Sequence, residues 1–218
     1  MSDAIITTEN LTKTYGSGAA ETHALRGATL AIPRGTFCAI VGPSGHGKST
    51  LMHLIGGLDH PSSGSVQVDG VELSGLSNGK LARLRAEKIG FVFQFFNLLG
   101  NLTAQENVAA AMMFAGVPAK LQKERSRELL ELVGLGQKLT ARPRELSGGQ
   151  QQRVAVVRVL ANRPSLILAD EPTAALDSQR GHQVMELFRK VAHEQNGAVI
   201  LVTHDHRALD VFNTIYEM

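Results

Sequence analysis

The sequence predicts an α/β fold, a parallel β-sheet wrapped in helices, and three observations lead to this prediction. Apolar runs of strand length alternate with stretches of helical periodicity along the chain. The strongest of these runs are apolar without interruption, as expected of strands buried on both faces of a parallel sheet. Between residues 95 and 160 the pattern is mostly helical, which indicates a helical subdomain within a single domain whose core is 1–94 and 161–218.

Strand patterns dominate the first half of the chain. They occur at residues 4–16, 22–35, 36–42, 64–70 and 89–94. The first two alternate only partially and are interrupted by glycines, so we expect short strands and turns there. The run TFCAIVG ends in glycine and contains no charge, as expected of a central buried strand. The following KSTLMHLIGGL has helical periodicity and ends at a glycine pair.

Helix patterns dominate the second half. They occur from 101 to 136, including an amphipathic stretch at 119–134, and again at 148–164, 178–197 and 206–212. Two buried strands, SLILADEP (165–172) and AVILVTHD (198–205), separate the later helices. The sequence stops inside an apparent further strand, NTIYEM, so we expect that a few residues follow it in the native chain.

Composition narrows the class of protein. The chain has 218 residues, 43% of them hydrophobic, and a formal net charge of +2, which gives no case for nucleic-acid binding. The single cysteine, Cys38, lies in an apolar run, so we expect a buried structural thiol. The start MSDAIITTEN is not a secretory signal, and the apolar stretch 108–117 is about half of the ~20 residues that a spanning helix needs. We therefore expect a soluble, cytoplasmic protein.

The stretch GPSGHGKST predicts a phosphate-binding loop. It matches G-x-x-x-x-G-K-[ST] and lies between a strand and a helix, the context that this motif requires. Its glycines allow backbone N–H groups to surround phosphates, Lys48 is expected to reach the β- and γ-phosphates, and Ser49 to offer a hydroxyl to Mg²⁺. The sequence thus predicts a P-loop nucleotide-binding protein. The predicted loop residues are Gly42, Pro43, Ser44, Gly45, His46, Gly47, Lys48, Ser49 and Thr50.

Acidic and polar residues follow three of the predicted strands. Asp170 ends the apolar run LILAD, where it is expected to hold Mg²⁺, and Glu171 beside it is placed to orient or deprotonate a water. Gln94 ends the strand IGFVFQ and is a candidate for binding Mg²⁺ or the attacking water. His204 follows the last long strand and is a candidate for contact with the γ-phosphate. Taken alone, a glutamine is more often a surface residue and a histidine more often structural.

A second phosphate-facing element is predicted at ELSGGQQQR. Ser147, Gly148, Gly149 and Gln150 stand at the start of a helix, where N–H groups and the helix dipole favour an anion. One nucleotide site does not explain why a single chain has two such elements about a hundred residues apart.

The set of motifs resembles that of ATP-binding cassette (ABC) ATPases. Tyr15, GPSGHGKST, Gln94, LSGGQ, LILADEP, ALD and VTHD occur in the family's order over nearly the whole chain. The resemblance implies a RecA-like core, an N-terminal antiparallel β subdomain and a helical subdomain with the signature LSGGQ. It further implies that Tyr15 stacks on adenine, that Glu171 is the general base and His204 the switch histidine. In such cassettes two chains dimerise head to tail on ATP, and each signature closes over the partner's nucleotide.

Within that family, FVFQFFNLLGNLTAQENV and LANRPSLILADEPTAALDS resemble the lipoprotein-release and macrolide-efflux group (MacB/LolD-like). The end of the chain resembles its cyanobacterial DevA-type exporters. The resemblance implies an ATPase that needs Mg²⁺ and drives an integral-membrane permease from the cytoplasmic face of the inner membrane, with a periplasmic membrane-fusion adaptor as a further partner. The alternatives are a cell-division-type cassette that signals without transport and a soluble cassette. The soluble kind is disfavoured because no long heptad pattern separates the phosphate loop from the signature.

Two further features lead to open hypotheses. Phe95, Phe96, Leu98 and Leu99 form an apolar cluster that is either subdomain core or part of a groove for the permease, and exposed side chains would favour the groove. His46 stands where relatives commonly have serine. It is either a tolerated surface variant or a contact to the partner's 175–177 turn, in which case His46→Ser should shift ATP-driven dimerisation.

Overall fold

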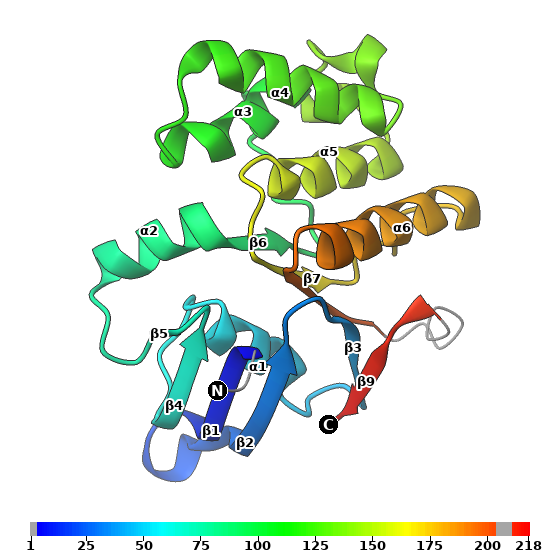
Figure 1. Ribbon diagram of the computed structural model, residues 1–218. Coiled ribbons are helices and arrows are strands. Elements are labelled where there is room, and N and C mark those ends of the chain that lie inside the picture. The colour runs from blue at the N-terminus through cyan, green and yellow to red at the C-terminus, as the bar shows by residue number, and fades with distance from the viewer. Residues whose placement is uncertain (1–3, 204–210) are drawn as a thin grey trace.

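A computed structural model describes residues 4–203 and 211–218. Figure 1 shows two β-sheets in the lower and middle parts of the molecule and a group of helices at the top. One sheet is antiparallel and the other parallel, as the strand pairings show. This arrangement confirms the predicted fold class of a parallel core with an N-terminal antiparallel part. Among the described residues, no helix is both long and apolar enough to cross a membrane.

The antiparallel sheet has the strand order β2-β1-β4-β5. Its strands are β1 (Ala4–Tyr15), β2 (Thr22–Pro33), β4 (Ser63–Val68) and β5 (Val71–Glu72). The prediction of short strands at the N-terminus was wrong, since β1 and β2 have 12 residues each. Their pairing contains several register shifts, for example between Thr8 and Leu11, and each shift reverses which side chains face inward. The shifts therefore explain why the alternation in the sequence is only partial.

The parallel sheet has the order β6-β7-β8-β3-β9. Its strands are β3 (Phe37–Val41), β6 (Ile89–Val92), β7 (Leu166–Asp170), β8 (Ala198–Val202) and β9 (Thr214–Glu217). Because the strands are parallel, the loops after β3, β6, β7 and β8 all leave from one edge of the sheet. That edge carries the phosphate loop and the acidic residues that the sequence singles out.

The two faces of the parallel sheet pack against different layers. In β7, Leu166 and Leu168 belong to one core together with helix α1 (Lys48–Ile55) and the antiparallel sheet. The intervening Ile167 and Ala169 belong to a second core with α5 (Gly148–Leu160) and α6 (Ser178–Glu194). Every described residue of β3 and β8 is buried, which explains why these strands are uninterrupted apolar runs. Cys38 is among them, and burial raises its pKa to about 12, as expected of a structural thiol.

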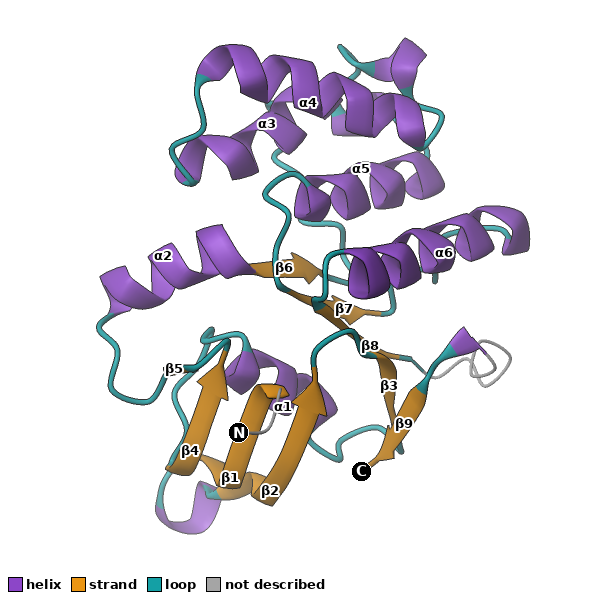
Figure 2. Ribbon diagram, viewed as in Figure 1, coloured by secondary structure: helices purple, strands orange, loops and turns teal. Residues whose placement is uncertain are grey.

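The helices at the top of Figure 2 form a third core of their own. They are α3 (Ala104–Phe114), α4 (Ala119–Leu132) and α5, followed or joined by short turns at η2 (Gly136–Lys138) and η3 (Pro143–Glu145). A further short turn, η1 (Gly18–Ala20), joins β1 to β2. Since α5 contributes side chains to this core and to that of the parallel sheet, it connects the two parts of the molecule.

Helix α2 (Asn78–Lys88) was missed by the sequence analysis. Only Leu81 of its residues is buried, so the sequence contains no apolar stripe of helical period. The predicted short helix at 206–212 and the candidate His204 lie largely or wholly outside the described residues.

Candidate nucleotide-binding site

The loop between β3 and α1 requires glycine at defined positions. Gly42, Gly45 and Gly47 have φ values of 146°, 81° and 87°, a region that other residues rarely adopt. At Gly47 a Cβ atom would lie 2.3 Å from the carbonyl oxygen of Ala24. Both conformation and close packing therefore exclude a side chain there. The result is a curled loop at the N-terminus of α1, where helix N–H groups favour an anion.

Lys48 is held against this loop. Its side chain is buried, with the residue 5% exposed, and Nζ donates hydrogen bonds to the carbonyl oxygens of Gly42 at 2.8 Å and Pro43 at 2.7 Å. The ammonium group therefore lies at the centre of the curled loop, on the side where a phosphate would be cradled.

Ser49 and Asp170 meet although they are far apart in sequence. Ser49 lies in α1, which follows β3, and Asp170 ends β7. Strands β3 and β7 flank β8, and Ile40 and Asp170 are both paired with Val202. This alignment brings the start of α1 to the end of β7, where Ser49 Oγ donates to Asp170 Oδ2 at 3.4 Å. A hydroxyl and a carboxylate in contact beside a phosphate loop are a donor set that suits Mg²⁺.

Glu171 lies directly beyond Asp170 in a constrained backbone conformation. Its φ is 48°, which is uncommon for a residue other than glycine and concentrates at functional positions. Its N–H donates to the carbonyl oxygen of Val202 at 3.0 Å, and its Oε2 accepts from Thr203 Oγ1 at 3.4 Å. These two contacts to the end of β8 fix both the backbone and the carboxylate of Glu171.

Gln94 lies in the loop two residues after β6 and is exposed. Strand β6 pairs with β7 up to Val92 and Ala169, so the loop leaves the sheet next to Asp170. The structure thus places Gln94 at the same sheet edge as the acidic pair.

Tyr15 ends β1 and is 42% exposed. Its hydroxyl donates to Asp59 Oδ2 at 2.8 Å. Burial and then this hydrogen bond raise the pKa of Tyr15, while the side chain of Thr50, the last residue of the phosphate loop, acts in the opposite direction. The Tyr15 hydroxyl therefore interacts with Asp59, which follows α1, and with Thr50 near the start of that helix.

The signature residues form the capped start of α5. Ser147 Oγ accepts from the N–H of Gln150 at 3.3 Å, and Gln150 Oε1 accepts from the N–H of Ser147 at 2.9 Å. A Cβ at Gly149 would lie 3.2 Å from the carbonyl oxygen of Ala175, so the helix start packs closely on the 175–177 turn of its own chain. The cavity between them contains no residue of the phosphate loop in its lining.

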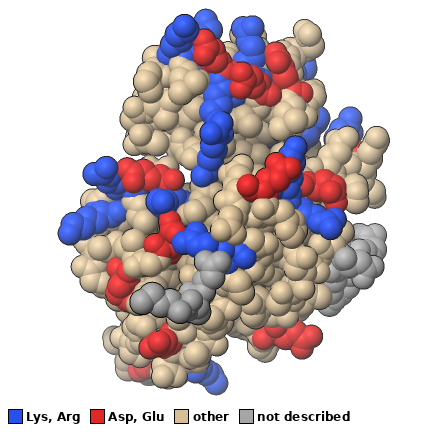
Figure 3. Space-filling model, viewed as in Figure 1, with Lys and Arg blue, Asp and Glu red and all other residues tan. Residues whose placement is uncertain are grey.

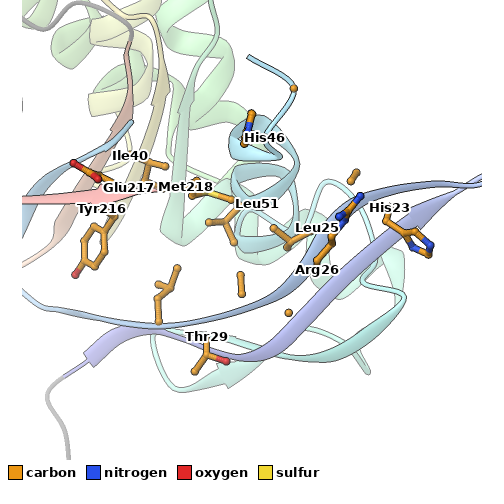
Figure 4. A pocket seen from close by; sticks show the side chains of 15 residues that line it. His23, Leu25, Arg26, Thr29, Ile40, His46, Leu51, Tyr216, Glu217 and Met218 are labelled. Atoms are coloured by element: carbon orange, nitrogen blue, oxygen red, sulfur yellow. The ribbon is translucent and has the colours of Figure 1, made fainter. Parts of the chain in front are cut away.

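His46 is exposed and its Nδ1 lies 3.3 Å from the carbonyl oxygen of Ser44. Figure 4 shows it among the residues that line a cavity between β2, the phosphate loop and β9. Its proposed contact to a second chain stays a prediction.

Comparison with known proteins identifies the family. A family model described as ABC transporter matches residues 25–174. An uncharacterized ABC transporter ATP-binding protein of Thermotoga maritima is 52% identical over 198 residues, which cover 91% of this chain and 84% of that protein. The chain belongs to the ABC transporter family. It is an ATP-binding cassette with the family's ATPase domain.

Further relatives agree with the predicted subgroup of the ABC family. Macrolide export ATP-binding/permease proteins MacB of Aggregatibacter actinomycetemcomitans and Vibrio parahaemolyticus are 48% and 46% identical over 98% and 100% of this chain. The chain spans 33% of the length of each of these two relatives. The dimeric structure of a post-hydrolysis state of the cassette MJ0796 bound to ADP and Pi matches with a TM-score of 0.92 and 41% identity, over 98% of this chain and 94% of that one.

Proposed function

We propose that this ATPase is the motor subunit of a membrane transporter, dimerising on ATP to drive a permease. The relatives named as macrolide export ATP-binding/permease proteins support an exporter of the MacB type, for lipid, lipoprotein or hydrophobic compounds. The dimeric solved structures of a related cassette support the homodimer. We further propose that residues 95–160 act as a helical subdomain attached to the core 1–94 and 161–218.

The loop 42–50 would hold the phosphates of ATP. Its backbone N–H groups and the Lys48 ammonium supply positive charge, and the partly exposed Tyr15 would stack on the adenine base, as the resemblance to the family implies. Ser49 and Asp170, already in contact, would hold Mg²⁺ together with Gln94 from the neighbouring loop. When bound, Mg²⁺ neutralises charge on the phosphates. Lys48→Ala should therefore weaken ATP binding itself, which calorimetric titration measures.

Glu171 would act as the general base. The hydrogen bond from its N–H to Val202 positions the backbone of Glu171, and the hydrogen bond from Thr203 positions its Oε2 atom, next to Asp170 in the chain. A fixed carboxylate can orient an attacking water and accept its proton. His204, which lies outside the described residues, would contact the γ-phosphate, as the resemblance to the family implies. Glu171→Gln should bind ATP and dimerise but hydrolyse poorly, and normal turnover of that variant would exclude Glu171 as the base.

The signature would complete the partner's site. The capping box holds Ser147 and Gln150 in place, and the first N–H groups of a helix have no partner within it, so those of Gly148 and Gly149 are suited to a phosphate. In its own chain the signature faces the 175–177 turn and not the phosphate loop. A second chain is therefore needed to bring the two phosphate-facing elements onto one nucleotide.

The observation that carries the permease proposal is an apolar groove. It runs between α2, β6, α3 and α5 and is lined in part by Phe91, Phe93, Leu99 and Phe114. Phe114 is 74% exposed and Leu99 51%, while Phe91 and Phe93 stack with ring centroids 5.5 Å apart. Exposed apolar side chains gathered in one groove support an interaction site here.

The apolar cluster predicted at residues 95–99 has members that fit the permease-groove hypothesis and members that fit the subdomain-core hypothesis. Phe95 is 79% exposed and Leu99 lines the groove, as the docking hypothesis requires. Leu98 is half-buried and packs on the core of α3–α5, as the subdomain-core hypothesis requires, and Phe96 is half-buried as well. The loop after Gln94 is thus anchored in the helical core through Leu98 and contributes Leu99 to the groove lining.

A cytoplasmic position on the inner face of the membrane and a periplasmic adaptor follow from the exporter proposal. A cell-division-type cassette would use the same groove to signal without moving a substrate. Figure 3 shows Lys and Arg mixed with Asp and Glu over the face drawn, so this face offers no continuous basic surface to a nucleic acid.

The test is isolation of the protein from its native membranes as Glu171→Gln with ATP and Mg²⁺, followed by mass spectrometry. A permease with a large extracytoplasmic domain plus an adaptor would establish export, and a permease with cell-wall hydrolase regulators would establish signalling. Adding Phe114→Glu should release the permease, whereas Leu132→Glu should retain it, because Leu132 is 64% exposed but lies outside the groove lining. ATP-driven dimers with no membrane protein would refute the proposal.

A further inference from the structure

Lys13 and Asp59 both contact Tyr15, and this pair is called the anchor below. The Asp59 carboxylate divides its oxygens between two partners: Oδ1 accepts from Lys13 Nζ at 2.7 Å and Oδ2 accepts from the Tyr15 hydroxyl at 2.8 Å. Lys13 Nζ also donates to the carbonyl oxygen of His60 at 2.7 Å. The Lys13 side chain is 12% exposed and that of Asp59 31%, so the ion pair is partly shielded from water.

The same lysine acts on the aromatic ring. Its Nζ lies 4.9 Å from the centroid of the Tyr15 ring, over the ring face, within the range of a cation–π interaction. The hydroxyl and one face are thereby fixed at the same time. Since Tyr15 remains 42% exposed, part of the ring is still open to a ligand beside the phosphate loop.

Asp59 must be ionised to accept hydrogen bonds from both Lys13 and Tyr15 through its two oxygens. Burial acts to raise the pKa of Asp59, but the hydrogen bonds from Lys13 and Tyr15 outweigh it and keep the pKa below its usual value. The carboxylate is therefore ionised at neutral pH and can accept hydrogen bonds from both neighbours.

We propose that Lys13 and Asp59 are positioning residues for the nucleotide base, because they preset the orientation of the Tyr15 ring on which the base stacks. This inference rests on the stacking role of Tyr15 in the proposed function. A ring that is already fixed loses no further freedom when a base stacks on it, whereas a free ring must be ordered on binding. Neither residue belongs to a nucleotide-binding motif of the sequence.

The expected effect is specific to the base. Without the anchor, ATP affinity should fall about 2- to 12-fold, the equivalent of ordering one side chain on binding. Inorganic tripolyphosphate has no base, so its affinity should stay unchanged. The variants are Lys13→Met and Asp59→Asn, and the matched control is Lys190→Met, which removes a lysine paired with Glu194 on the distant surface helix α6.

Tyrosine fluorescence gives a direct readout. The chain has two tyrosines and no tryptophan, so Tyr216→Phe leaves Tyr15 as the sole emitter. In this background ATP should quench Tyr15, and tripolyphosphate should not. Asp59→Asn should also lower the pKa of Tyr15 towards its usual value, since the Asp59 contact acts to raise it. Calorimetry with both ligands, run on all variants, completes the experiment.

The outcomes are distinct. Weaker ATP binding with unchanged tripolyphosphate binding would establish the positioning role. An equal loss for both ligands would overturn it, because Lys13 and Asp59 would then support only the loop itself. Unchanged ATP affinity in both variants would overturn it as well. Absence of quenching in the Tyr216→Phe protein would remove the stacking premise, while the ATPase motor proposal would stand.

Discussion

Two helix caps in this protein have nearly the same geometry, but only one of them is expected to affect ATP-driven dimerisation. Ser147 caps α5 with an Oγ···N distance of 3.3 Å to Gln150, and Thr103 caps α3 with 3.2 Å to Glu106, each within a reciprocal capping box. Replacing either cap by alanine should cost about 1 kcal/mol of unfolding free energy. For a chain of this size that corresponds to a fall in Tm of about 2–4 °C.

Only the Ser147 cap is proposed to face a nucleotide. If its hydroxyl binds the partner's γ-phosphate, Ser147→Ala also loses a hydrogen bond to a charged group, worth about 1.5–3 kcal/mol. The head-to-tail dimer contains this contact twice, so ATP-driven dimerisation should weaken about 150- to 20,000-fold in Ser147→Ala. In Thr103→Ala it should remain at the wild-type level.

The assay combines thermal unfolding with analytical ultracentrifugation in ATP, using the Glu171→Gln background so that dimers persist. Equal losses of Tm with a dimer defect in Ser147→Ala alone would support the signature's role. Equal losses of Tm with equal dimerisation would refute it, because Ser147 would then be a cap and nothing more.

Three further predictions concern the scaffold. Gly90→Ala should destabilise the protein by about 1–3 kcal/mol in urea unfolding, because its Cβ would lie 2.2 Å from a valine methyl of α5, whereas Gly79→Ala, with no atom within 4 Å, should not. Arg158→Lys keeps the charge but cannot span the two carbonyls of the 96–97 segment, so unfolding free energy should fall by about 1–3 kcal/mol. Asp69→Asn should destabilise the protein at pH 7. Its hydrogen bond from Arg34 is the main cause that lowers the pKa of Asp69, so this stabilisation exists above the unfolded pKa and the difference from wild type should shrink below about pH 4.

Local motifs could be predicted from the sequence because their chemistry depends on neighbouring residues. The curled loop at 42–50 needs glycine at positive φ, and LILAD needs only a buried strand with an acid at its end. Both features are visible in a short window. The two motifs suggested that Ser49 and Asp170 share a Mg²⁺ site, but their contact depends on the order of the β-strands, which the motifs do not contain.

Long-range contacts of ordinary residues could not be predicted. Lys13 and Asp59 are 46 residues apart, and Arg158 reaches the carbonyl of Asn97 across 61 residues. No local pattern distinguishes Lys13 from a surface lysine, or Arg158 from the polar face of an amphipathic helix. Helix α2 was missed for a related reason, since a helix with one buried residue has almost no apolar signal.

The two hydrogen bonds from Lys48 to its own loop leave one donor of the ammonium for a ligand. An ammonium has three N–H donors, and the carbonyl oxygens of Gly42 and Pro43 accept two of them. The third N–H and the positive charge are therefore held in place before any ligand binds, so a phosphate meets a charge-assisted donor that needs no reordering. A nucleoside without phosphates gains nothing from this preset charge, whereas a nucleotide does.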